Sequence, residues 1–251
     1  MRPRVRVALL AALAILPPAL VALAMPAAAQ SISIDLGQGQ GVAERAIQLI
    51  ALVTILSLAP SILIMVTCFT RIIVVLSLLR TAIGAGTAPP NNVMVALAIF
   101  LTAFIMAPTF REAYDLGVRP FMQGQIDAEQ AFERGSRPFH TFMLKHAREN
   151  DIRLFQDLSR EPRPERPEDL SLRVLVPAFM ISELKRAFEI GFLLYLPFLV
   201  IDLVVASVLM AMGMMMLPPV AVSLPFKLIF FVLVDGWNLV AGSLVQSYGP
   251  S

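Results

Sequence analysis

Three charged residues in the C-terminal part of this sequence stand where a charge is costly. Asp202, Lys227 and Asp235 interrupt runs that are otherwise apolar. A charged side chain at the centre of a membrane helix costs about 2.5–3.5 kcal/mol, so such residues usually face a partner or water. Two kinds of chemistry would explain them: an ion pair between Asp202 and Lys227, or a relay that passes protons through the membrane.

The spacing of these residues favours the ion pair. If Pro218 and Pro219 mark the turn of a helical hairpin, Asp202 lies about 15 residues before the turn and Lys227 about 10 after it. At about 1.5 Å per residue, their depths differ by less than about 10 Å. We therefore predict an intramembrane ion pair, within one subunit or between subunits. The alternative is that Lys227 snorkels to the interface and Asp202 points into water.

The other reactive side chains give no sign of catalysis. A relay would need a series of acids and histidines, but His140 and His146 are six residues apart and do not share a helical face. They are predicted to be surface residues rather than metal ligands. Cys68, the single cysteine, lies in an apolar run and is predicted to be a core residue. No nucleophile–base pattern or phosphate-binding loop is present, so no enzyme, metal or cofactor is expected.

The composition is that of an integral membrane protein. The chain has 251 residues, of which 57% are hydrophobic and 15% charged, whereas soluble domains carry roughly a quarter charged residues. The net charge of +2 is small and the basic residues are scattered, which argues against binding to nucleic acid.

The N-terminus has the order of a secretory signal peptide. The apolar run Val7–Met25 precedes small residues suited to cleavage between Ala29 and Gln30. Pro17 and Pro18 favour this interpretation over an uncleaved first membrane helix, which is the alternative. Cleavage would place the mature N-terminus outside the cytoplasm. Three arginines supply the positive n-region: Arg2, Arg4 and Arg6.

After a polar leader (30–45), the sequence predicts an all-α fold of integral membrane helical hairpins. Three of four apolar segments exceed the roughly 20 residues that cross a bilayer, and the second is marginal. Pro60 and Pro197 predict kinks in the first and third segments. The segments are 46–69, 93–108, 187–216 and 219–245. They form a first hairpin (46–109) and a second hairpin with a methionine-rich loop (174–251).

Between the hairpins lies a polar extracytoplasmic insert (110–173), which holds more than half of the charged residues. Its apolar residues have near-helical spacing and predict two short amphipathic helices with a break near Gly135–Pro138. Three prolines then predict an extended linker: Pro162, Pro164 and Pro167.

The distribution of charge also bears on orientation. Arg71 and Arg80 follow the first segment and indicate a cytoplasmic side there. Lys185 and Arg186, beside the third segment, contradict that scheme. The contradiction suggests that these helices are not ordinary lipid-spanning ones.

Two stretches resemble the FliP family of flagellar biosynthesis proteins, which is related to the SctR proteins of virulence systems. The first is TCFTRIIVVLSLLRTAIGAGTAPPNNVMVALAIFLTAFIMAP (67–108). The second is PAFMISELKRAFEIGF (177–192), which continues to Asp202 and MGMMMLPP. The resemblance covers the chain from about Ala46 to the C-terminus, and the polar insert is its variable part.

The resemblance implies a core, pore-forming subunit of the type III export gate in the flagellar basal body, at the bacterial inner membrane. About five copies would assemble with FliQ and FliR around a channel, with FlhB and FlhA nearby. Unfolded flagellar axial proteins would pass through this channel. Much of the ring would stand above the bilayer plane, which would ease the conflict over Lys185 and Arg186.

The resemblance also gives roles to individual residues. Met214, Met215 and Met216 would form a gasket that closes the channel, and Pro218 and Pro219 would fix its turn. Leu217 extends the run with a branched side chain, whereas Met210 and Met212 would pack between helices. Asp202 and Lys227 would form the ion pair, and a rigid turn is predicted from two prolines, Pro89 and Pro90. Glu183 and Lys185 would meet different partners at a subunit seam.

Other functions remain open at this point. A virulence-type injectisome would use the same kind of subunit, and a secondary transporter of a small solute would also be membrane-embedded. A scaffold that nucleates assembly without a pore is the third alternative. We see no internal repeat of the kind that transporters commonly show.

Overall fold

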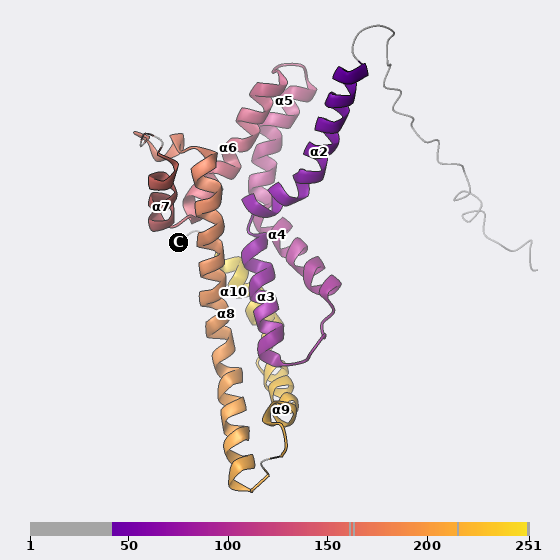
Figure 1. Ribbon diagram of the computed structural model, residues 1–251, viewed down its shortest axis with the longest axis vertical. Helices are drawn as coiled ribbons and strands as arrows, with labels where there is room; N and C mark the ends of the chain where they lie inside the picture. Colours follow the sequence, from indigo (N-terminus) through magenta and orange to yellow (C-terminus); the bar gives the residue numbers. More distant parts are fainter. Residues whose placement is uncertain (1–41, 161, 163, 215, 250–251) are drawn as a thin grey trace, which may run out of the picture. The chain divides into compact units, whose positions relative to one another are not determined.

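The computed structural model describes residues 42–160, 162, 164–214 and 216–249 (Figure 1). The chain forms two units, Met1–Ile50 and Ala51–Ser251. Of the first unit, only the start of helix α2 (Val42–Val66) is described, so the account below concerns the second unit. All regular secondary structure in the described residues is helical, which confirms the predicted fold class.

Helix α3 (Phe69–Ile83) is central to the core of the second unit. The segment Pro60–Val66, which starts at the predicted proline kink, turns by 82° into α3. Gly84 ends α3 in the left-handed conformation (φ 76°), and its N–H donates to the carbonyls of Arg80 and Thr81. Apolar residues at helical spacing bury one face of α3: Ile72, Val75, Leu76, Leu79, Ala82 and Ile83.

The second apolar segment is longer than the sequence indicated. Helix α4 (Asn91–Ala113), the π-helix η2 (Tyr114–Val118) and α5 (Arg119–Met122) form one continuous helical stretch of 32 residues. A Cβ added to Gly117 would lie 2.7 Å from the carbonyl oxygen of Ala131. The glycine therefore allows η2 to approach the backbone at Ala131, in the helix Ala128–His146.

The polar insert contains helices α6 (Ala128–His146) and α7 (Glu149–Ser159). The break predicted near Gly135–Pro138 is wrong, because α6 continues through both residues to His146. Gly135 packs against η2 there, and tertiary packing outweighs its low helix propensity. The linker prediction is confirmed for the described residues, since between the end of α7 and Ser171 they form only one short turn, η3 (Pro167–Asp169).

Helix α8 (Leu172–Ala211) has 40 residues and begins well before the predicted start at Ala187. The predicted segment stopped at the charged residues that precede Ala187, but the helix includes them. Its first half is packed and its second half is largely exposed. The buried residues of α8 are Val174, Leu175, Ala178, Phe179, Ser182, Glu183, Ala187, Gly191, Phe198 and Leu209.

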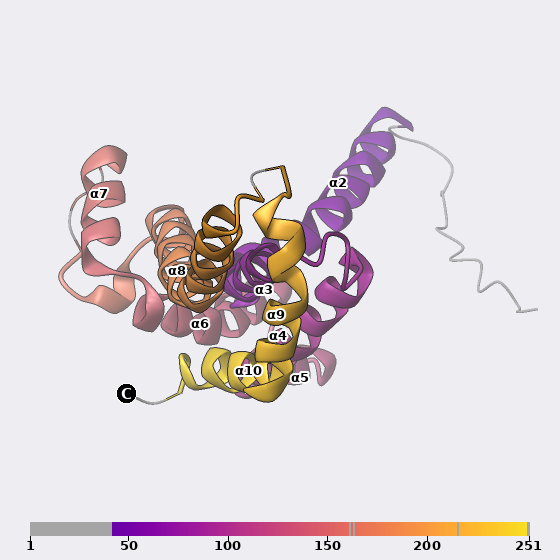
Figure 2. The ribbon, with the colours of Figure 1, turned by 90° about the horizontal axis from the view of Figure 1, so that it is seen from below.

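Helices α9 (Pro219–Leu233) and α10 (Gly236–Gln246) complete the fold and meet at a bend of 62°. Helix α9 packs back on α8, so the two helices form a hairpin. Seen along the bundle (Figure 2), α3 lies between α8 and α4, with α9 along another side. A Cβ on Gly191 would lie 2.2 Å from Cδ1 of Leu78, so this glycine sets the close contact of α8 with α3.

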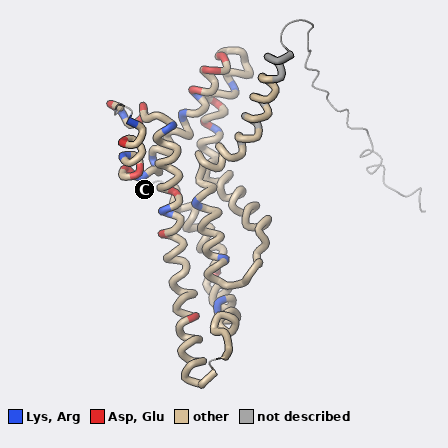
Figure 3. The backbone as a smooth tube through the Cα atoms, viewed as in Figure 1, with Lys and Arg blue, Asp and Glu red and all other residues tan. Residues whose placement is uncertain are grey.

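Among the described residues, two helices are long and apolar enough to cross a membrane, or up to four if each bent pair counts as one span: Asn91–Met122 and Leu172–Ala211. The bent pairs join Pro60–Val66 to α3 and α9 to α10. Lys, Arg, Asp and Glu gather on the insert helices and are sparse along the far half of α8 and on α9 (Figure 3). The structure is therefore that of a membrane protein with one polar end.

Candidate functional site

The methionine loop (residues 212–218) forms the tip of the hairpin between α8 and α9. Gly213 has a left-handed conformation (φ 74°) that L side chains rarely adopt, and it reverses the chain after α8. The N–H of Met214 then donates to the carbonyl of Leu209 at 2.9 Å. Pro218 caps α9 and Pro219 begins it, where a missing N–H costs nothing. The loop is thus fixed at both of its ends.

The side chains of the loop are uncovered within this subunit. Met216 is 99% exposed and Met214 is 39% exposed, while Met215 lies outside the described residues. The packing predicted for Met210 and Met212 is wrong for the isolated subunit, because both are exposed. Exposed apolar side chains at one tip indicate a surface that is covered by something other than this chain.

An apolar cavity of about 560 Å³ runs between α8 and α9 towards the loop. Valine side chains of α8, Val222 and Phe226 of α9, and Met212 at the loop line it. The structure describes no polar contact within it that would select a small-molecule ligand.

The structure brings Asp202 and Lys227 together within one subunit. The Nζ atom of Lys227 lies 2.7 Å from Oδ2 of Asp202, and the lysine side chain is 3% exposed. Ser223, one turn before Lys227 on the same face of α9, donates to Oδ1 of Asp202. Both carboxylate oxygens therefore accept from α9.

Lys227 also reaches a third helix. Its Nζ donates to the carbonyl of Ala82 at 3.0 Å, in the last turn of α3. Carbonyls in the last turn of a helix have no partner within the helix and carry the negative end of its dipole, so a cation is stabilised there. Lys227 consequently links α9 to both α8 and α3. Asp235, the third charge in the apolar runs, is exposed at the α9–α10 bend and takes no part in this cluster.

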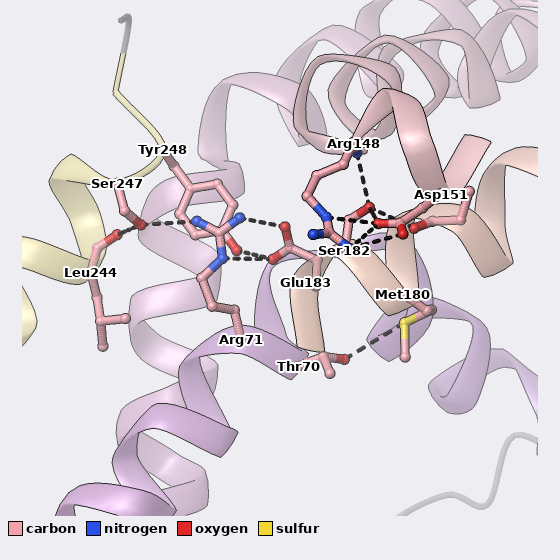
Figure 4. A network of polar contacts seen from close by, with 11 residues as sticks. Thr70, Arg71, Arg148, Asp151, Met180, Ser182, Glu183, Leu244, Ser247 and Tyr248 are labelled. Atoms are coloured by element: carbon pink, nitrogen blue, oxygen red, sulfur yellow. Dashed lines mark hydrogen bonds and ion pairs between the residues drawn. The ribbon is translucent and has the colours of Figure 1, made fainter. Parts of the chain in front are cut away.

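A second cluster of buried charges was not predicted from the sequence (Figure 4). Arg71 of α3 is 1% exposed, and its guanidinium binds both carboxylate oxygens of Glu183 on α8, with Nε 3.0 Å from Oε2. The hydroxyl of Tyr248 donates to the same Oε2. Burial raises the pKa of the Tyr248 phenol well above its ordinary value, so the hydroxyl stays protonated and can donate.

This cluster corrects two sequence arguments. Arg71 is an internal ion-pair residue, so its position is explained by Glu183 and gives no support for a cytoplasmic boundary. Glu183 meets Arg71 inside the subunit, whereas Lys185 is exposed and lies 3.9 Å from Glu189. The one signal in the sequence is that apolar residues continue directly after Arg71, at Ile72–Val75, which a boundary arginine does not require. The sequence does not show that α3 packs against α8, and this packing brings Arg71 and Glu183 together.

The histidine prediction was also wrong in part. His146 is buried beside the rings of Phe142 and Tyr248. Burial, with contributions from Arg71, Arg186 and Lys145, lowers the pKa of His146 from 6.5 to about 4. The imidazole is therefore neutral at pH 7. Among the described residues, no group of three or more His, Cys, Asp or Glu side chains could hold a metal ion.

Cys68 is fully buried with a free thiol, which confirms the prediction of a core residue. The loop from α3 to α4 contains Pro89 and Pro90, with a cis peptide bond between Ala88 and Pro89. Arg80 donates across this loop to the carbonyl of Pro89 and to the side chain of Asn91. The predicted signal cleavage site, Ala29 and Gln30, lies outside the described residues.

Comparison of the sequence with known proteins identifies a family. The FliP family model matches residues 52–244. A flagellar biosynthetic protein FliP from Caulobacter vibrioides is 62% identical over 227 residues, which cover 89% of this chain and 85% of the relative. The FliP proteins of Pectobacterium carotovorum (56% identical; 80% of this chain and 78% of the relative) and Bacillus subtilis (52%; 80% and 91%) match over 202 residues. With this coverage and identity, the chain belongs to the FliP family.

Proposed function

We propose that this chain is the core, pore-forming subunit of the flagellar type III protein export gate, and that its methionine loop closes the channel. The chain is a component of flagellar biosynthesis and protein export, as its relatives are. The observation that carries the pore role is the loop itself: apolar side chains stand exposed at the tip of a hairpin whose two helices are tied by a buried ion pair.

Methionine suits a closure that must open for large substrates. Thioether side chains are unbranched and adapt their rotamers at little cost, so they can seal an empty pore and reshape around a passing chain. An apolar constriction also resists water and ions. In this proposal Met214, Met215 and Met216 form the seal, and Leu217 stands at its edge. Pro218 and Pro219 keep the loop at a fixed place.

The exposed apolar side chains of α8 and α9 support assembly with other chains. In our proposal about five copies of this subunit surround the channel together with FliQ and FliR, and FlhB and FlhA lie nearby. Unfolded axial proteins of the flagellum are the substrates. The complex would belong to the flagellar basal body in the inner membrane, with more than one helix of each subunit in the apolar layer. The proposed role is structural and not enzymatic.

The relatives named above are all flagellar proteins, so a role in an injectisome is not favoured. The solute-transporter alternative differs in the kind of binding site that it requires. A transporter would use polar groups at a central site, whereas the cavity between α8 and α9 is lined by apolar side chains.

The test replaces Met214, Met215 and Met216 together by alanine in cells that lack the native copy. The proposal predicts normal assembly of the complex, leakage of small ions through it, and altered export of flagellar subunits. Replacement of the same residues by leucine should restore the seal but slow export, because branched side chains repack less easily. Met122→Ala is the matched control, since Met122 is also strongly exposed but lies at the end of α5. Assembly with no leak and unchanged export would contradict the proposal.

A further inference from the structure

Ser182 and Glu183 are neighbours on α8, and both side chains are fully buried (Figure 4). Successive residues of an α-helix project about 100° apart, so the two side chains face different elements. Each one binds a segment that is distant in the sequence. Together they form what is called here the polar lock.

The Glu183 side of the polar lock holds the C-terminal end of the described chain. Arg71 and Tyr248 both bind the Glu183 carboxylate. Arg71 Nη1 also donates to Oγ of Ser247 at 3.1 Å, and its guanidinium carbon lies 3.9 Å from the centre of the Tyr248 ring. One arginine therefore contacts two consecutive residues that follow α10, by a hydrogen bond and a cation–π contact.

The Ser182 side holds the start of α7. The backbone N–H of Arg148 donates to Oγ of Ser182 at 2.9 Å, and that Oγ lies 2.6 Å from Oδ2 of Asp151. Arg148 in turn binds both oxygens of Asp151, each at 2.8 Å. Asp151 is 7% exposed, so its charge depends on these partners.

The two sides also meet through the end of α6. The ring of Tyr248 stacks on Phe142, with ring centres 5.9 Å apart, and contacts His146 edge to face at 5.0 Å. The chain leaves α6 after His146 and reaches Arg148 two residues later. A shift of either segment would thus disturb groups that position the other.

We propose that the polar lock couples the docking of α7 and of the C-terminal segment onto α8, so that loss of either segment loosens the other. Arg71, Asp151, Ser182, Glu183 and Tyr248 are buried, and Arg148 and Ser247 are half-buried. No buried side-chain nitrogen or oxygen of the described residues lacks a hydrogen-bond partner, so removal of one group leaves another without a partner in a medium of low dielectric. If α8 turned to give such a group a new partner, the neighbouring residue on α8 would be moved away from its own partner.

The position of the lock gives it a consequence for the whole subunit. It lies in the first half of α8, where the buried residues of that helix gather, and far along the helix from the methionine loop. The lock would hold α3, α7, the first half of α8 and the C-terminal segment as one body. The exposed half of α8 and the loop would be left free to adjust to neighbouring chains. This inference concerns the fold and does not depend on the proposed export role.

The test is amide hydrogen exchange, followed by mass spectrometry, on the purified full-length protein in its complex. Tyr248→Phe keeps the ring on Phe142 and His146 and removes only the hydroxyl bound to Glu183. Ser182→Ala removes only the α7 side. Ser207→Ala is the matched control, because Ser207 lies on α8 and donates to the carbonyl four residues back, as Ser182 does, but is exposed.

The proposal predicts that Tyr248→Phe speeds exchange in α7 and that Ser182→Ala speeds exchange in the last turns of α10, each by about tenfold or more. Ser207→Ala should change neither. If each variant loosens only the segment that it touches, or if neither variant changes exchange, the coupling does not exist. Should Ser182→Ala fail to fold, the response of α7 to Tyr248→Phe decides the question alone.

Discussion

The Nζ atom of Lys227 lies 2.7 Å from one carboxylate oxygen of Asp202 and 3.0 Å from the main-chain oxygen of Ala82. This arrangement ties α9 to α8 and to the end of α3 with a single buried cation. It also means that Lys227 is held by a helix terminus as well as by a carboxylate. Because of the second contact, exchange of the two charges is not expected to be neutral.

Asp202→Ala should destabilise the subunit by about 3 kcal/mol or more, because it strands the buried Lys227. The double variant Asp202→Lys/Lys227→Asp should recover only part of the loss, since an aspartate at 227 would face the carbonyl of Ala82 and the negative end of α3. Thermal unfolding of the purified complex measures the loss in the single variant and the recovery in the double variant. The pairing would play no part in stability if the double variant were no better than either single one.

Removal of Glu183 should be more harmful than removal of a surface acid of the same type. Glu183→Gln leaves Arg71 buried without its counter-charge and should cost about 3–5 kcal/mol. Replacement of both partners by apolar residues, Arg71→Met with Glu183→Leu, should recover most of that cost. The control is Glu133→Gln, whose salt bridge with Arg137 is about two-thirds exposed and should contribute at most about 1 kcal/mol. Equal losses at the two sites would contradict the argument.

Stability should fall as the pH drops from about 6.5 towards 4, in part because of His146. The pKa of His146 in the folded protein is about 4, against 6.5 ordinarily, so in this window the unfolded chain binds a proton that the folded protein does not. Above pH 6.5 both states are neutral at this residue and it adds no pH dependence. In His146→Phe, the unfolding temperature should therefore decline less steeply over this window. His140→Asn, on the same helix, controls for the loss of a histidine, and identical slopes in wild type and His146→Phe would refute the assignment.

The contact of α3 with α8 should be sensitive to a single methyl group. Gly191→Ala would place a Cβ 2.2 Å from Cδ1 of Leu78, and overpacking of this kind costs about 1–3 kcal/mol. The second change Leu78→Ala should relieve the clash and recover part of the loss. Gly242→Ala in α10 is the matched control, because no atom lies within 4 Å of its added Cβ and alanine favours helix. An unfolding temperature unchanged by Gly191→Ala would show that α3 can move aside.

Much of the fold was predictable because it depends on local pattern. Long apolar runs, the proline pair before α9 and the isolated charges at 202 and 227 indicated a membrane hairpin and placed two charges at similar depth. Helix boundaries were less predictable. The sequence indicated a break in α6 at Gly135–Pro138 and a late start for α8, and in both places tertiary contacts support a longer helix.

The sequence by itself determined the class of the protein and indicated the second hairpin, because apolar runs must be helical in lipid and Pro218 and Pro219 separate two such runs. Only the tertiary structure decided the partners of Arg71 and Glu183. Arg71 and Glu183 are far apart in the sequence, and nothing local distinguishes an arginine at a membrane boundary from one inside a core. That distinction depends on which helices pack together, because a buried charge is stable only where another element supplies its counter-charge.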